Sequence, residues 1–115
     1  MANIEVPSSE ASSEEVDKVI DTSVILSLID QGKYEEAKQN LLIIMENNKQ
    51  DAEVYNLLGY TERQLQNYTI AIKYYKMALS LKKDFIGAHH YIAMAYLELD
   101  DIANAKYHLN QLDLI

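Results

Sequence analysis

The chain lacks cysteine and has little glycine or proline. No cysteine occurs among its 115 residues, which excludes disulfide bonds, thiolate metal sites and cysteine nucleophiles. Three glycines and one proline fall far below the roughly 12% that these two residues contribute to average proteins. A β-sandwich or β-barrel needs many tight turns, so this scarcity favours α-helices joined by short loops.

Basic residues and long apolar segments are scarce as well. Ten Lys and Arg stand against 18 Asp and Glu, and the net charge of −8 has the wrong sign for binding a nucleic-acid backbone or an anionic bilayer. The longest strongly apolar run, residues 41–45, is too short to span a membrane. The chain begins with neither the basic nor the apolar region of a secretory signal. We therefore expect no nucleic-acid partner, no membrane insertion and a cytoplasmic location.

The N-terminal residues differ in composition from the rest. Residues 1–21 contain six acidic residues and one basic residue, a net charge of −5 out of the total of −8. The first dozen residues are rich in Ser and Glu and show no helical periodicity. This composition is typical of disorder, so we expect a disordered acidic tail over residues 1–15. Ser12 and Glu15 have the spacing of a capping box that begins the first helix.

From about residue 18, apolar residues recur every three or four positions, as in helices that bury one face. Short polar segments interrupt this pattern. It predicts six helices, at residues 16–30, 34–47, 52–65, 68–82, 85–99 and 102–113. Asn67 and Asp101 stand just before two of these helices, and both have side chains suited to capping.

The sequence also repeats itself with a period of 34 residues. Ala37, Ala71 and Ala105 form one column of this repeat. Four further columns agree in size and polarity: Tyr34, Tyr68 and Ile102; Leu41, Tyr75 and Leu109; Ile44, Ala78 and Leu112; and Val24, Leu58 and Ile92. A recurring small residue indicates that two helices cross there, because a larger side chain would push their backbones apart. We expect Gly59 to face Ala71, and Ala93 to face Ala105.

This pattern resembles the tetratricopeptide repeat, an antiparallel helix pair that stacks into a right-handed superhelix. The best match runs from Ala52 to Phe85, and its signature positions hold Tyr55, Leu58, Gly59, Tyr68, Ala71, Tyr75 and Ala78. The first unit departs from the pattern, since Asp21 stands where a bulky core residue is expected. The resemblance predicts an all-α, right-handed α-solenoid of about three antiparallel helix pairs, at residues 16–50, 51–84 and 85–115.

The resemblance also implies a function. In this family the first helix of each pair lines a concave groove that binds extended peptides or partner helices. The positions expected to contact a partner are Asn56, Tyr60, Arg63, Gln64, His90, Met94 and Leu97. Such residue types are common in interfaces. We therefore expect a non-catalytic protein-interaction module or adaptor that binds a protein or peptide.

Some family members hold the C-terminal carboxylate of chaperones with a clamp of Lys, Asn and Arg. The corresponding positions here are Thr22, Leu26, Leu57, Gly87 and Tyr91, so we do not expect that partner. An apolar segment or an amphipathic helix suits the groove better.

Three alternatives remain open at this point. The last pair is not followed by the usual polar capping helix, which leaves Leu112, Leu114 and Ile115 as oligomer contacts of a self-assembling scaffold subunit. His90 and His108 could serve a metal protein or small enzyme, although no catalytic, cofactor or metal site is expected. We expect His89, in the core column of Tyr55, to be structural. Finally, residues 4–7 could occupy the groove as an internal ligand.

Overall fold

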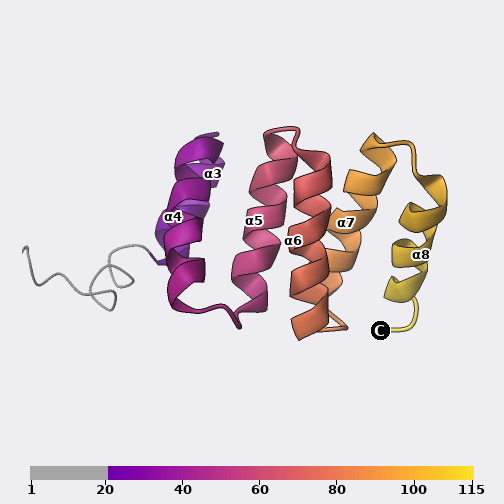
Figure 1. Cartoon of the computed structure of the whole chain (residues 1–115). Helices are drawn as coiled ribbons and strands as arrows, with labels where there is room; N and C mark the ends of the chain where they lie inside the picture. Colours follow the sequence, from indigo (N-terminus) through magenta and orange to yellow (C-terminus); the bar gives the residue numbers. More distant parts are fainter. Residues whose placement is uncertain (1–20) are drawn as a thin grey trace, which may run out of the picture.

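The computed structural model describes residues 21–115, which form six α-helices and no strand (Figure 1). The helices are α3 (Thr22–Asp30), α4 (Tyr34–Asn47), α5 (Ala52–Gln64), α6 (Tyr68–Leu81), α7 (Ile86–Glu98) and α8 (Ile102–Leu112). They form three antiparallel pairs, and each pair packs beside the next along a row (Figure 1). Within this part of the chain, every helix is too short or too polar to cross a membrane.

Five of the six predicted helices agree with the structure to within one residue at each end. The first does not, because α3 begins at Thr22 rather than at residue 16. Asp21 has an extended backbone, and its carboxylate accepts a hydrogen bond from the Val24 amide at 3.1 Å. Asp21 is therefore an N-cap and not a core residue, which explains why it breaks the repeat. The predicted tail and the capping box of Ser12 lie outside the described residues.

The predicted helix caps are confirmed for Asp101 and wrong for Asn67. Asp101 accepts a hydrogen bond from the Asn104 amide at 3.2 Å. The Asn67 side chain makes no cap and instead donates to the Glu62 carboxylate at 2.8 Å. A buried carboxylate is the stronger acceptor for that amide, and it needs partners because it has lost its water.

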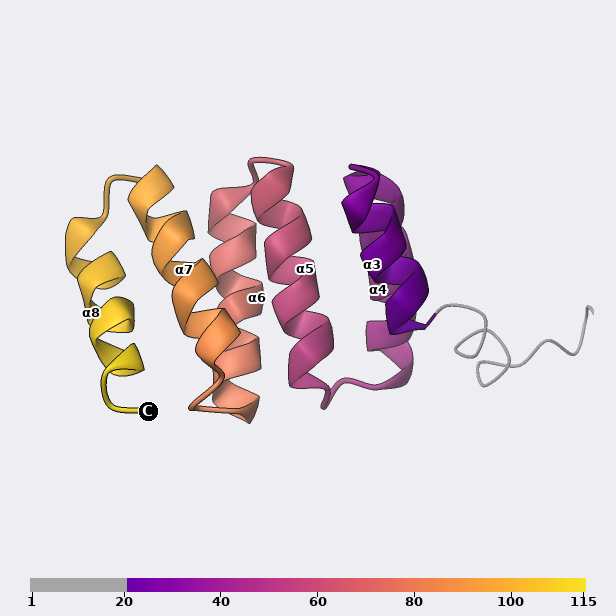
Figure 2. The ribbon, with the colours of Figure 1, turned by 180° about the vertical axis from the view of Figure 1, so that it is seen from behind.

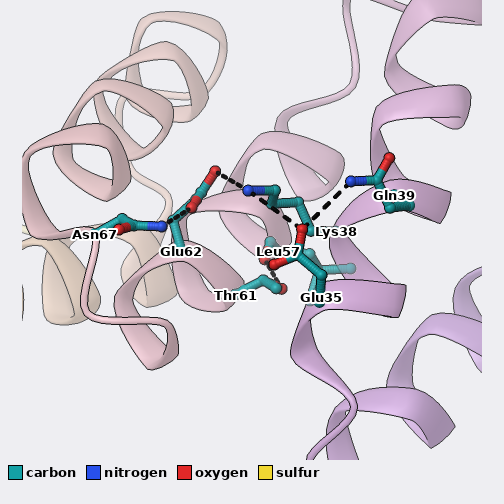
Figure 3. A network of polar contacts seen from close by, with 7 residues as sticks. All are labelled: Glu35, Lys38, Gln39, Leu57, Thr61, Glu62 and Asn67. Carbon is teal, nitrogen blue, oxygen red and sulfur yellow. Dashed lines mark hydrogen bonds and ion pairs between the residues drawn. The ribbon is translucent and has the colours of Figure 1, made fainter.

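Glu62 is also the centre of a polar network that joins the first two helix pairs (Figure 3). Its side chain is buried, and Lys38 of α4 lies 3.6 Å from its second carboxylate oxygen. Lys38 also reaches Glu35 at 3.7 Å on its own helix. The network therefore ties α4 to α5 and to the turn before α6, where Asn67 stands.

The alanine column of the 34-residue repeat lies in the core, whereas Val24, Ile102 and Leu109 of the other columns are exposed. Ala37, Ala71 and Ala105 are all buried, as the repeat predicts. Two core residues one repeat apart make equivalent hydrogen bonds. The Tyr55 hydroxyl donates to the carbonyl of Lys49 at 2.9 Å, and His89 Nε2 lies 2.8 Å from the carbonyl of Lys83. His89 thus replaces a tyrosine in the core, which confirms its structural role.

The tightest contact inside a pair is between Gly59 of α5 and Tyr75 of α6. A Cβ atom at residue 59 would lie only 2.6 Å from the Tyr75 ring. The sequence predicts that Gly59 faces Ala71. In the structure, the atoms nearest to a Cβ at residue 59 belong to the Tyr75 ring instead. Tyr75 has no exposed surface, so its ring has nowhere to move.

We expect Gly59→Ala to destabilise the fold by about 1–3 kcal/mol, because the added methyl group overlaps a ring that cannot withdraw. Gly87→Ala is the matched control. A Cβ atom at that helical position would meet its nearest neighbour at 3.5 Å, an ordinary contact. Urea unfolding followed by circular dichroism measures both. Equal unfolding midpoints for the two variants would contradict the proposed overlap.

A histidine pair joins α7 to α8. His89 Nδ1 and His108 Nδ1 lie 3.1 Å apart, and the Tyr96 ring stacks on His108 with centroids 5.8 Å apart. Because His89 Nε2 donates to the Lys83 carbonyl, its Nδ1 is left to accept from His108. Burial, with smaller effects from the nearby His89 and Lys76, lowers the pKa of His108 to about 4.

This pKa predicts a pH dependence of stability. His108 has an ordinary pKa of 6.5 when unfolded and about 4 when folded, so between these values the unfolded chain binds more protons. Stability from this group is complete above pH 6.5 and is lost as the pH falls toward 4. We expect the melting temperature to fall more between pH 7 and pH 5 in the parent chain than in His108→Asn. Because the carboxylates are common to both proteins, an equal fall would rule out the histidine as the cause.

Candidate functional site

The first helices of the three pairs, α3, α5 and α7, lie on one side of the molecule, which we call the first-helix face. Figure 2 shows them in front of α4 and α6. Helices α5 and α7 contact each other directly, although they belong to different pairs. Side chains from two repeats therefore meet on this face.

At the seam between α5 and α7, Tyr60, Arg63 and Tyr91 form a compact group, which we call the tyrosine–arginine cluster. The Tyr60 and Tyr91 ring centroids are 5.3 Å apart. The Arg63 guanidinium carbon lies 5.4 Å from the first ring and 5.6 Å from the second. Both distances are within the range of a cation–π interaction, so the guanidinium contacts both rings.

The cluster rests on Tyr75 of α6. The Tyr75 ring lies 6.2 Å from the Tyr91 ring, and His90 contacts Tyr91 at 5.5 Å. Burial raises the pKa of Tyr75, against a smaller lowering by the Arg63 side chain, whose N–H groups and positive charge lie beside the hydroxyl. The phenol therefore stays protonated at neutral pH and is a poor nucleophile.

Three buried polar atoms at this place have no hydrogen-bond partner among residues 21–115. They are Asn56 Oδ1, Arg63 Nε and the Tyr75 hydroxyl oxygen. A buried polar group without a partner costs about 1–3 kcal/mol, and native proteins contain few of them. All three belong to the cluster or to the residues beside it. The site thus contains a local excess of polar groups that the described chain does not satisfy.

Arg63 is electrostatically isolated. It is the only arginine of the chain, and α3, α5 and α7 contain no lysine. Within the described part of the chain, the acidic groups that form ion pairs bind Lys38 or Lys49, and none binds Arg63. The first-helix face therefore presents one positive charge that has aromatic neighbours but no anion.

The seven residues predicted to contact a partner occupy different environments. Asn56 is buried, at 5% exposure, whereas Tyr60, Arg63 and Gln64 are half-buried. His90 is exposed, as are Met94 and Leu97 at 38% and 41%. The structure brings Tyr60 and Arg63 together and adds His90 through Tyr91. Gln64, Met94 and Leu97 make no ring contact, ion pair or hydrogen bond with the cluster.

Two residues of the site are not among those predicted from the sequence. Tyr91 occupies one of the positions that correspond to the chaperone-binding clamp. Because it is not Lys, Asn or Arg, the sequence gives no reason to select it, and its contact with Tyr60 is missed. Tyr75 matches a core signature position, so its hydroxyl is overlooked. The available signal was the number of tyrosines near the only arginine, but the register between α5 and α7 is needed to connect them.

The residues predicted as oligomer contacts lie at the C-terminal end. Leu114 and Ile115 are exposed, at 79% and 53%, and Leu112 is half-buried. Leu114 and Ile115 help to line a cavity of about 580 Å³ together with Leu81, Lys82, Lys83, Asp84, His89 and Gln111. The predicted uncovered apolar residues are thus present, at a place separate from the cluster.

The alternative built on His90 and His108 does not agree with the structure. His108 pairs with His89, whereas His90 contacts Tyr91 on the first-helix face. Within residues 21–115, no group of three or more histidine and carboxylate side chains is placed to hold a metal ion.

Comparison with known proteins agrees with the architecture. The tetratricopeptide-repeat family model matches residues 52–85, the central helix pair. An uncharacterised protein of Cyanophora paradoxa, ycf37, is 36% identical over 86 residues, which are 71% of this chain and 49% of that protein. The chain thus spans about half the length of that relative.

Solved structures give the same result. A mutant of MamA matches with a TM-score of 0.75 and 25% identity over 85% of this chain and 75% of that chain. SycD, a type III secretion translocator chaperone of Yersinia enterocolitica, matches in its complex with a peptide of the translocator YopD. Here the TM-score is 0.77 and the identity 21%, over 87% of this chain and 75% of that chain. The predicted all-α, right-handed solenoid is confirmed, and its central helix pair matches the tetratricopeptide-repeat family.

Proposed function

We propose that this chain is a non-catalytic protein-interaction module whose first-helix face binds a segment of a partner protein. The observation that supports it is the tyrosine–arginine cluster, whose Tyr60 and Arg63 side chains are half-buried and share one surface. A bound segment can contact the exposed parts of both side chains. Tyrosine and arginine are also the residues that most often dominate binding energy in interfaces.

The apolar residues beside the cluster support the same proposal. Met94 and Leu97 are exposed three residues apart on α7, and so lie on one side of that helix. A partner that covers them gains hydrophobic energy next to the polar contacts of the cluster. This arrangement of apolar and polar groups is typical of sites that bind an extended segment or an amphipathic helix. SycD, which shares the fold, has been solved with a peptide bound.

We expect Tyr60→Ala and Met94→Ala each to weaken the binding of peptides selected against the parent chain from a random 12-residue display library. Loss of a central contact in an interface commonly costs more than about 1 kcal/mol, or more than roughly fivefold in affinity. Fluorescence anisotropy with the selected peptides measures the effect.

Met77→Ala is the matched control for this experiment. Met77 lies on α6, away from the first-helix face, and is 43% exposed. The Met77→Ala variant therefore removes a similarly exposed methionine from a different surface of the molecule. If Met77→Ala weakened binding as much as Met94→Ala, or if neither Tyr60→Ala nor Met94→Ala changed it, the first-helix face would not be the binding site.

A second candidate function is self-assembly through the C-terminal end. It is favoured by the exposed Leu114 and Ile115, and by three further exposed side chains on α8, namely Ile102, Tyr107 and Leu109. Grouped exposed apolar residues often mark contact surfaces. A second copy stacked on α8 would cover them.

If this second function holds, the molar mass from light scattering should rise with concentration over a hundredfold range, because association follows mass action. Leu114→Glu should abolish the rise by placing a charge in the contact. Ile70→Glu, at a 45% exposed position on α6, should not. A constant monomer mass at every concentration would exclude self-assembly.

A further inference from the structure

We propose that the segment bound by the first-helix face places an aspartate or glutamate side chain, flanked by apolar residues, against the Arg63 guanidinium. This proposal rests on the function proposed above and names the chemistry of its partner. A carboxylate is the natural acceptor for a guanidinium, because its two oxygens match the planar fork of N–H donors.

Arg63 is half-buried on the first-helix face, and no described carboxylate neutralises its charge. The rings of Tyr60 and Tyr91 both lie within cation–π distance of the guanidinium. Part of the loss of water and of side-chain freedom that an ion pair normally requires has therefore already occurred in the free protein.

The surroundings define the rest of the partner. Asp30 and Glu98 occupy the positions in α3 and α7 that correspond to Gln64, and both are exposed. A run of several acidic residues would be repelled by these charges, so a single carboxylate is favoured. The exposed Met94 and Leu97 favour apolar side chains next to that carboxylate in the bound segment. Arg63 lies on the middle helix of three, so a bound segment continues past it on both sides. The carboxylate is therefore that of a side chain and not of a chain terminus.

The test compares two libraries of acetylated, amidated 11-residue peptides that differ only at the central residue, which is Glu in one and Gln in the other. The flanking positions are randomised among Ala, Leu, Ile, Met and Phe. The full chain should retain the Glu library about tenfold more strongly, as expected for a charge-assisted contact. Arg63→Gln should remove this preference, Arg63→Lys should leave part of it, and Lys76→Gln, at an exposed lysine of α6, should leave all of it.

A second readout is independent of any variant. Because Arg63 is the only arginine, its Nε–H group gives a single arginine side-chain signal in a ¹H–¹⁵N spectrum. Adding the Glu library should shift this signal, and adding the Gln library should not. Backbone signals of α5 and α7 report binding in both cases.

The outcomes separate the two proposals. Retention of both libraries to the same extent, with no shift of the Arg63 signal, would overturn the carboxylate while leaving binding by the first-helix face intact. Retention of neither would overturn both. If a Gln library with a free C-terminus is retained as strongly as the Glu library, the recognised group is a terminal carboxylate. If deleting residues 1–15 moves the Arg63 signal without peptide, the chain's own acidic residues are the ligand.

Discussion

The contact between Gly59 and Tyr75 is the constraint on which the rest of the structure depends. A methyl group at residue 59 would lie 2.6 Å from the Tyr75 ring, so glycine allows α5 and α6 to approach as closely as they do. The same contact fixes Tyr75, which is fully buried and lies 6.2 Å from the Tyr91 ring of the next pair. One packing choice thus sets the distance within a pair and supports the aromatic surface between two pairs.

Arg63 shows how this packing creates a site. Half-burying a charge is costly unless a counter-charge or dipoles replace its water. Here the rings of Tyr60 and Tyr91 provide part of that replacement, and no described carboxylate provides the rest. The chain satisfies its other buried charge in full, since Glu62 is bound by Lys38 and Asn67. The contrast between these two neighbouring residues of α5 separates a charge that has ion-pair and hydrogen-bond partners from one that has no described counter-charge.

The periodicity of the sequence was sufficient to predict the architecture, because every pair buries the same alanine column. Ala37, Ala71 and Ala105 show this directly, and five helices end within a residue of their predicted bounds. The predictions that fail concern side chains that have an alternative partner or role, or contacts that depend on how one helix pair is positioned against the next. Asn67 prefers a buried carboxylate to a helix cap, and Asp21 ends the pattern as an N-cap. The contact of Tyr60 with Tyr91 depends on how one pair sits on the next. A 34-residue repeat shows which positions of two repeats are equivalent. It does not show which side chains of adjacent repeats contact each other.

The distribution of charge over the two sides of the solenoid bears on specificity. Lysines are numerous on and just after α6, at residues 73, 76, 82 and 83, and all four are exposed. Ion pairs formed there would be weakened by water and salt and would lose side-chain freedom, so each is worth little. The single cation of the first-helix face already lies against two rings and is partly desolvated. An anionic group that reaches it therefore gains more than one that meets the lysines, and a chain of net charge −8 can still select an acidic side chain at one defined point.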